Sequence, residues 1–186
     1  MKQPLPYLLF CFLCLLSCTK DHDYTVVYLI KAGNNYSQQE GLSILNKSSI
    51  SAAVTFNESA IYTTVDPINQ GDINKLIGFS DCNSLHQQNS ARFGWNWQNN
   101  QLHIYAYCYV NGVRNSQELG TAELGKAYEY KVEVKEDHYL FTFNGQEFTM
   151  SRGCTQTTGL IHYRLYPYFG GDEPAPHDIT IQVEEH

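Results

Sequence analysis

The sequence is short of positive charge, of cysteine and of long apolar runs, and each shortage excludes a class of protein. Its 186 residues contain 12 Lys and Arg against 19 Asp and Glu, a formal net charge of −7. This balance argues against binding to nucleic-acid phosphates and against an electrostatic hold on anionic lipid. Six cysteines are too few for a disulfide scaffold. No segment has the roughly 20 consecutive apolar residues that a transmembrane helix requires.

The longest apolar run, residues 7–16, follows Lys2 and has the length of a secretory signal-peptide core. The residues after it, Leu15-Leu16-Ser17-Cys18, resemble a bacterial lipobox, in which the cysteine is acylated and becomes the first mature residue. We therefore expect residues 1–17 to be a lipoprotein signal peptide and residues 18–23 to be a short tether anchored to the membrane by lipid on Cys18. A plain secretory peptide with a cysteine at its cleavage site is the alternative.

Residues 19–23 (TKDHD) are similar to the export signal, a lysine among acidic residues, that some Gram-negative bacteria use for surface lipoproteins. This resemblance implies a protein that is lipid-anchored to the outer membrane and exposed at the cell surface.

Short β-type runs separated by Asn, Gly, Asp and Ser recur between residues 25 and 183. The pairs at 99–100, 111–112 and 144–145 are Asn-Asn or Asn-Gly, which favour two-residue hairpin turns. This spacing predicts an all-β sandwich of two antiparallel sheets. No repeat or proline-rich linker divides the chain, so we expect a single domain over residues 24–186.

The predicted strand at residues 102–110 alternates two sets of side chains. Leu102, Ile104 and Val110 are apolar and share one face with Ala106 and Cys108. The opposite face carries His103 and three tyrosines. Either set is a plausible core, so the pattern leaves open which face is buried.

Tyrosines and polar side chains also gather in the predicted strands around residues 91–97 and 161–168. Tyrosine rings stack on the apolar faces of sugars, while Arg, His and Asn form hydrogen bonds with hydroxyl or carboxylate groups. We therefore expect a face that binds a polysaccharide or another extracellular ligand, formed by Arg92, Asn96, His103, Tyr105, Tyr107, His162, Arg164 and Tyr166. The alternative is that these aromatic residues pack beneath a second layer or loops.

The segment at residues 167–178 combines glycines and prolines with three acids, Asp172, Glu173 and Asp178. Oxygen ligands on a rigid loop suit Ca²⁺. The three acids follow no recognised ligand spacing, however, so a solvated loop without a cofactor is the favoured interpretation.

Three cysteines remain after cleavage of the signal peptide, so at most one disulfide can form. Cys82 and Cys154 lie in polar, turn-like segments, whereas Cys108 lies inside an apolar strand. This distribution favours a bond between Cys82 and Cys154. No paired Cys/His spacing supports a zinc site.

Several segments between residues 79 and 183 resemble concanavalin A-like jelly rolls: ARFGW at 91–95, IYAYCYVNG at 104–112 and YPYFGGDEPAPHDITI at 166–181. The superfamily includes laminin-G-type binding modules and polysaccharide lyases, and some surface lipoproteins of glycan-degrading bacteria carry similar modules. The resemblance implies a jelly-roll sandwich, and it makes non-catalytic glycan binding the leading interpretation.

Alginate-lyase-like jelly rolls provide an enzymatic alternative. In that family an Arg-bearing strand, a Gln-Ile/Val-His segment and a Tyr-rich strand follow in order, as do Arg92, residues 101–103 (QLH) and residues 163–168 here. The resemblance implies a uronate lyase that uses Arg92, His103 and Tyr166 to neutralise a carboxylate and move a proton. The segment ARFGW departs from the family's Arg-Thr-Glu-Leu-Arg pattern. A third possibility is a structural or adhesion lipoprotein that binds a protein partner.

Overall fold

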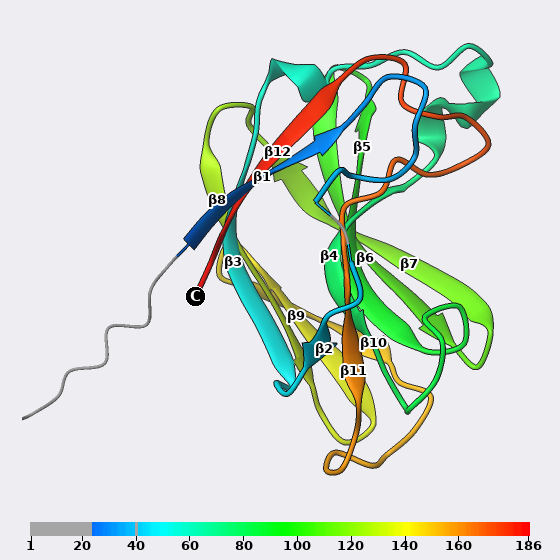
Figure 1. The fold of residues 1–186 in the computed structure, drawn as a ribbon, viewed down its shortest axis with the longest axis vertical. Coiled ribbons are helices and arrows are strands. Elements are labelled where there is room, and N and C mark those ends of the chain that lie inside the picture. The colour runs from blue at the N-terminus through cyan, green and yellow to red at the C-terminus, as the bar shows by residue number, and fades with distance from the viewer. Residues whose placement is uncertain (1–23, 40) are drawn as a thin grey trace, which may run out of the picture.

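A computed structural model describes residues 24–39 and 41–186 of the chain. In this part, two six-stranded antiparallel sheets pack face to face (Figure 1). The predicted all-β sandwich of two antiparallel sheets is therefore confirmed. The predicted signal peptide, Cys18 and the tether lie outside the described residues.

The first sheet has the strand order β1-β12-β3-β8-β9-β10. Its strands are β1 (Tyr24–Ile30), β12 (Ile179–Glu185), β3 (Ser49–Phe56), β8 (Ala127–Val134), β9 (His138–Phe143) and β10 (Gln146–Ser151).

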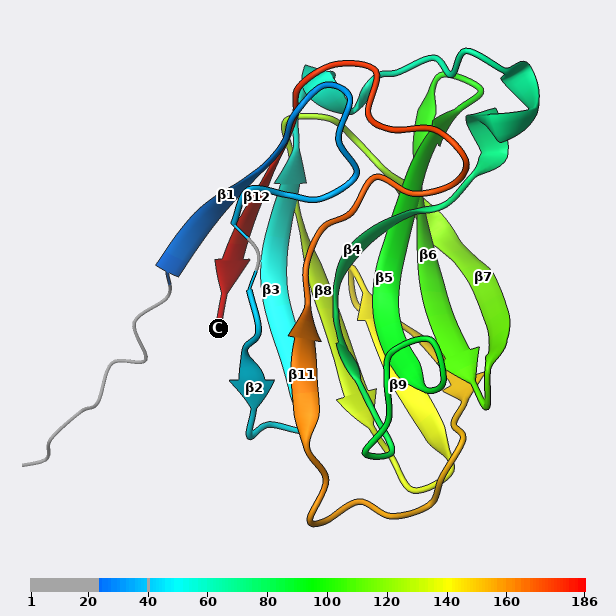
Figure 2. The ribbon, with the colours of Figure 1, turned by 45° about the vertical axis from the view of Figure 1, so that its right-hand side comes forward.

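The second sheet has the order β2-β11-β4-β5-β6-β7, and most of its strands are seen side by side in Figure 2. Its strands are β2 (Ile44–Leu45), β11 (His162–Leu165), β4 (Asn74–Ser80), β5 (Ser90–Gln98), β6 (Gln101–Val110) and β7 (Val113–Ala122). Two short 3-10 helices, η1 (Glu58–Ala60) and η2 (Pro67–Gly71), lie between β3 and β4.

The predicted hairpin turns form the β5–β6, β6–β7 and β9–β10 connections. Both turn residues have a positive φ in each case, for example 48° at Asn144 and 79° at Gly145. Asparagine and glycine tolerate this backbone conformation, which matches the twist of the flanking strands.

The core lies between the two sheets, and it shows which face of β6 is buried. Leu102, Ile104, Ala106 and Cys108 of β6 are fully buried against it. The tyrosines of β6 therefore point to the outer face of the second sheet, because successive residues of a strand face opposite sides. This arrangement settles the orientation that the sequence left open.

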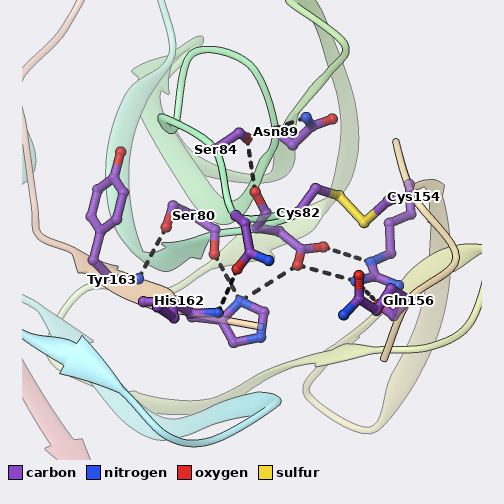
Figure 3. Close-up of polar contacts among 12 residues, drawn as sticks. Ser80, Cys82, Ser84, Asn89, Cys154, Gln156, His162 and Tyr163 are labelled. Atoms are coloured by element: carbon purple, nitrogen blue, oxygen red, sulfur yellow. Dashed lines mark hydrogen bonds and ion pairs between the residues drawn. A yellow bond between two sulfur atoms is a disulfide. The ribbon is translucent and has the colours of Figure 1, made fainter. Parts of the chain in front are cut away.

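A disulfide between Cys82 and Cys154 joins the β4–β5 connection to the β10–β11 connection (Figure 3). This is the pairing that the sequence favours, and Cys108 is a buried free thiol. Beside the disulfide, the buried carboxylate of Asp81 accepts hydrogen bonds from Arg152 Nε at 2.5 Å and from the hydroxyl of Tyr139 at 2.9 Å. A buried polar network therefore closes this end of the sandwich.

Candidate functional site

A cleft of about 570 Å³ opens on the outer face of the second sheet, over β11, β4, β5 and β6. Six tyrosines line it, with nitrogen-bearing side chains among them. We call it the tyrosine cleft and define it by Tyr36, Tyr107, Tyr109, Tyr163, Tyr168, Lys75, His86 and Arg92.

The register of β5 and β6 brings the floor of the tyrosine cleft together. Arg92 lies opposite Tyr107, and Ser90 lies opposite Tyr109. Residues directly opposite each other in an antiparallel pair share a face of the sheet. On the other side of β5, Gly78 of β4 lies opposite Arg92, and a Cβ atom there would lie 2.2 Å from that of Arg92. A glycine at position 78 therefore leaves the space that the arginine side chain occupies.

Arg92 places a positive charge in the floor. Its Nη2 donates to the carbonyl oxygens of Leu76 at 3.1 Å and Tyr166 at 2.5 Å, while its buried Nε has no hydrogen-bond partner. Burial lowers the pKa of Arg92 to about 10. The guanidinium is still protonated at neutral pH, held under the cleft by two backbone contacts.

Lys75 forms a second cationic group at the cleft. Its N–H donates to the carbonyl of Tyr168 at 2.8 Å, and the N–H of Tyr168 donates back to the Lys75 carbonyl at 3.0 Å. The ammonium Nζ lies 5.2 Å from the ring centroid of Tyr107 and 5.7 Å from that of Tyr168, in the range of cation–π contacts. Burial, and then the charges of Arg92 and Arg114, lower the pKa of Lys75 to about 8.

The tyrosines and His86 supply hydrogen-bonding groups to the cleft. Burial, and then the neighbouring Tyr109, raise the pKa of Tyr107 to about 12. His86 donates its backbone N–H to the hydroxyl of Tyr163 at 2.6 Å, and its ring Nδ1 lies 3.0 Å from the same oxygen. Burial, and then Arg92, lower the pKa of His86. The cleft therefore combines aromatic faces, phenolic hydroxyls and two fixed cations.

Of the residues predicted to bind a ligand, Arg92 and Tyr107 contribute their side chains to the tyrosine cleft. Asn96, His103 and Tyr105 lie further along the same face. Asn96 pairs with His103 four positions from the Arg92–Tyr107 pair, a separation of about 13 Å along the strands. This second group is engaged in its own contacts.

Those contacts occupy the polar atoms of the second group. The Nδ2 of Asn96 donates to the carbonyl of Gly71 at 3.1 Å, and the hydroxyl of Tyr105 donates to Asn96 Oδ1 at 3.3 Å. The ring nitrogens of His103 lie 2.7 Å from Glu118 Oε1 and 3.2 Å from the Gln98 carbonyl. These side chains lie outside the tyrosine cleft.

The structure corrects the predicted orientation of the β11 side chains. Arg164 lies opposite Phe79, a fully buried core residue, so its side chain points between the sheets. There it forms an ion pair with Glu185 of β12. His162 also points inward, with Nδ1 at 2.9 Å from the carbonyl of Ser80 (Figure 3). The ring of Tyr166 packs against Tyr28, with centroids 6.1 Å apart.

Arg164 and Tyr166 border the cleft, but their functional groups are directed to these internal contacts. Arg92, His103 and Tyr166, the three residues considered for a lyase, are consequently not brought together. His103 is too far along β6, and Tyr166 meets Arg92 only through its backbone carbonyl.

Sequence reasoning overlooked Tyr36, Lys75, His86 and Tyr163, which contribute to the cleft. Tyr163 alternates with the inward-facing His162 and Arg164, so the alternation placed it on the wrong face. Lys75 reaches the cleft through the paired backbone hydrogen bonds with Tyr168, a contact between distant segments. A known pairing between β4 and β11 would have revealed both.

The three acidic residues of the predicted loop make contacts with separate parts of the protein. Glu173 accepts hydrogen bonds from the N–H groups of Val65 at 2.7 Å and Asp66 at 2.8 Å. Asp178 forms an ion pair with Lys31 at 2.8 Å, and the N–H of Asp172 donates to Asp72. The favoured interpretation of a loop that closes the sandwich fits these contacts.

Metal-ligating side chains converge at one place in the described part of the chain, where Asp81 meets Cys82 and Cys154. Both sulfur atoms are bonded in the disulfide, so this group does not provide thiolate ligands. Across residues 24–39 and 41–186, no helix is long and apolar enough to span a bilayer.

No protein-family model and no curated protein matches the chain. Solved structures do match. A structure of alginate lyase AlyC3 has a TM-score of 0.60 and 12% identity, covering 86% of this chain and 72% of that one. A polysaccharide lyase family 18 enzyme, aly-SJ02, has a TM-score of 0.54 and 10% identity, covering 88% of this chain and 86% of that one.

A laminarinase from Flavobacterium sp. UMI-01 has a TM-score of 0.51 and 10% identity, covering 87% of this chain and 78% of that one. The TM-scores demonstrate a shared fold, and identities this low assign no activity. Together with the two antiparallel sheets, they show that the described chain is a concanavalin A-like jelly roll.

Proposed function

We propose that the protein binds a glycan in the tyrosine cleft, without cleaving it, at the surface of a bacterial cell. The observation that carries this proposal is the cleft itself, a volume of about 570 Å³ lined by six tyrosines with fixed polar groups between them. Aromatic faces with a few oriented hydrogen-bonding groups suit the alternating apolar and hydroxylated surfaces of sugars.

The fold comparison supports a glycan over other extracellular ligands. A structure described as alginate lyase AlyC3 in complex with dimannuronate has the same fold, with a TM-score of 0.57 and 11% identity. A sandwich of this kind can therefore present an oligosaccharide site. The proposal for this protein depends on the residues of its own tyrosine cleft.

Binding without cleavage is favoured by the separation of the residues considered for a lyase. Abstraction of a sugar proton requires a base and a carboxylate-neutralising group on the same sugar ring. His103 is engaged by Glu118 and Gln98 at a distance from Arg92, and the ring of Tyr166 packs against Tyr28.

The anchor belongs to the same proposal. Lipid on Cys18 would hold a domain whose first strand begins at Tyr24. The tether of about six residues spans roughly 20 Å when fully extended. The tyrosine cleft would thus lie close to the outer-membrane surface, where extracellular polysaccharides are encountered.

The proposal predicts that the double variant Tyr109→Ala/Tyr168→Ala loses affinity for its glycan by about tenfold or more, because each ring–sugar contact contributes on the order of 1 kcal/mol. The measurement is affinity electrophoresis of the purified protein in gels that contain individual neutral and acidic polysaccharides. The ultraviolet absorbance of unsaturated uronates is followed in parallel.

Tyr24→Ala is the matched control, because this exposed tyrosine lies on β1 of the other sheet. Retention of the double variant at the wild-type level would contradict the site. A rise in absorbance would contradict binding without cleavage and revive the lyase.

A further inference from the structure

The charges of the tyrosine cleft identify the class of glycan, an inference that depends on the proposed glycan binding. Lys75 and Arg92 line the cleft, and the residues that line it in the described part of the chain include no Asp or Glu. The whole protein carries a net charge of −7. A cationic cleft on an acidic protein is a local arrangement that the overall composition does not produce.

No carboxylate among the described residues forms an ion pair with either cation. The Nζ of Lys75 contacts the rings of Tyr107 and Tyr168 and has no ion-pair partner among the described residues. The buried Nε of Arg92 also has no acceptor. A charge that is half-buried without a counterion is costly, and an anion bound beside it would offset that cost.

A third cation reinforces the field at this position. Arg114 of β7 lies opposite Tyr109, which places it on the same face of the sheet as the cleft. Its charge acts on Lys75 in the same direction as that of Arg92, while Asp72 is the acid that opposes them. The Oδ2 of Asp72 already accepts a hydrogen bond from the N–H of Asp172 at 3.3 Å.

We propose that the tyrosine cleft selects acidic polysaccharides, with a sugar carboxylate or sulfate bound beside Lys75 and Arg92, and that Lys75 determines this selectivity. Tyr107 and Tyr168, whose rings hold the Lys75 ammonium, contact the sugar ring that carries the anion. The Arg92 guanidinium supplies a fixed charge beneath the cleft. The Lys75 ammonium supplies the charge that binds the anionic group, which neutral sugars lack.

Lys75 also makes the selectivity dependent on pH. The groups that face it are Arg92 from β5, Tyr107 from β6, Arg114 from β7, Tyr168 after β11, and Asp72 after η2. Burial, and then the charges of Arg92 and Arg114, keep the pKa of Lys75 low, at about 8. The ammonium is therefore present below this pH and is lost as the pH rises through it. Affinity for an acidic polymer falls over the same range.

The test is titration of the purified protein with four polymers: polygalacturonate, its carboxyl-reduced form, dextran sulfate and dextran. We expect binding of at least one acidic polymer at pH 7 and weaker binding of its neutral counterpart. Lys75→Met lowers affinity for the acidic polymer by about tenfold or more, because it removes a charge-assisted hydrogen bond to the anion. It leaves affinity for the neutral polymer unchanged.

Lys75→Arg shows whether the effect of Lys75→Met comes from the lost charge or from a folding defect. Because arginine keeps its proton to a higher pH than lysine, this variant retains the acidic polymer and loses the fall in affinity between pH 7 and about 9. Lys131→Met, on β8 of the other sheet, removes the same charge away from the cleft and serves as the matched control. Thermal melting checks that each variant is folded.

The outcomes distinguish the two proposals. Polygalacturonate alone identifies a carboxylate as the recognised group, and dextran sulfate alone identifies a sulfate. Equal binding of polygalacturonate and its reduced form, or equal loss in Lys75→Met and Lys131→Met, overturns acidic selectivity and leaves glycan binding intact. Binding of none of these polymers or of any neutral glycan overturns both.

Discussion

Asp81 is a buried carboxylate that depends on its neighbours for a counterion and hydrogen bonds. Its side chain and that of Arg152 are both fully buried. Burial alone would raise the pKa of Asp81, but hydrogen bonds from Arg152, from the N–H of Cys82 and from the hydroxyl of Tyr139 outweigh it and lower the pKa. The pair therefore remains ionised and acts as one unit.

Asp81→Asn should lower the free energy of unfolding by about 3–5 kcal/mol, because it leaves the Arg152 guanidinium buried without a counterion. Urea denaturation at neutral pH measures this loss. Asp137→Asn, which neutralises a largely exposed carboxylate, should cost much less stability than Asp81→Asn. Equal losses in the two variants would contradict the role of the buried pair.

The pH dependence of the same pair follows from the sign of its shift. Since the folded pKa of Asp81 lies below the unfolded value of about 3.9, its contribution is complete above that value and is lost as the pH falls through the folded pKa. The stability gap between the wild type and Asp81→Asn should narrow in acid. A gap that is constant down to the pH of unfolding would contradict this assignment.

Residue patterns predicted part of the site. Arg92 and Tyr107 were identified because tyrosines alternate with apolar residues in β6 and because arginine lies in the facing strand. His162 and Arg164 were placed on the wrong face, since alternation says which residues share a face and not which face is buried. The pairing of Arg164 with the core residue Phe79 decides the matter, and that pairing joins distant segments.

At the scale of elements, the connection after β11 shows how an irregular segment completes a site. The sequence predicts a strand over residues 161–168, whereas β11 ends at Leu165. Proline at 167 cannot donate a hydrogen bond to a neighbouring strand. Tyr168 then pairs with Lys75 and with Tyr36 through isolated bridges. Local propensity predicts the strand, but it does not predict that Tyr168 pairs with Lys75 and Tyr36 after the strand has ended.

The Cys82–Cys154 disulfide links the β4–β5 connection covalently to the β10–β11 connection. Cys82 and Cys154 are separated by 72 residues, so their bond closes a long loop of the unfolded chain. Its removal in Cys82→Ala/Cys154→Ala should lower the free energy of unfolding by about 4 kcal/mol. Denaturation with and without a reducing agent measures the effect.

Cys108→Ala is the control for the disulfide, because this buried thiol takes no part in it. The shift that the reducing agent causes should persist in Cys108→Ala and disappear in the double variant. A shift that persists in the double variant would show that the reductant acts elsewhere.

At the scale of the whole molecule, a jelly-roll sandwich in a protein with a net charge of −7 presents a cationic cleft. The class of fold was predictable, because turn signals and alternating strands are local features of the sequence. The strand order was not, since β12 pairs with both β1 and β3, and these contacts span most of the chain. The cleft depends on such long-range pairings, so its full membership required the structure.

The proposed anchor is tested on the whole molecule in a Gram-negative host. Wild-type protein should fractionate with the outer membrane and become labelled by a fatty-acid analogue, because lipid on Cys18 supplies the membrane affinity. Cys18→Ser should lose the label and leave the outer membrane. Continued co-fractionation of Cys18→Ser with membranes would contradict the lipoprotein assignment.

The most direct test of the central claim is an NMR titration of the purified protein with oligogalacturonate. Glycan binding in the tyrosine cleft predicts that the largest chemical-shift changes fall on Lys75, Arg92, Tyr107, Tyr163 and Tyr168, and that the first sheet is unaffected. Changes centred on Asn96, His103 and Tyr105, or on the first sheet, would place the site elsewhere. The absence of change with this and with neutral oligosaccharides would contradict glycan binding itself.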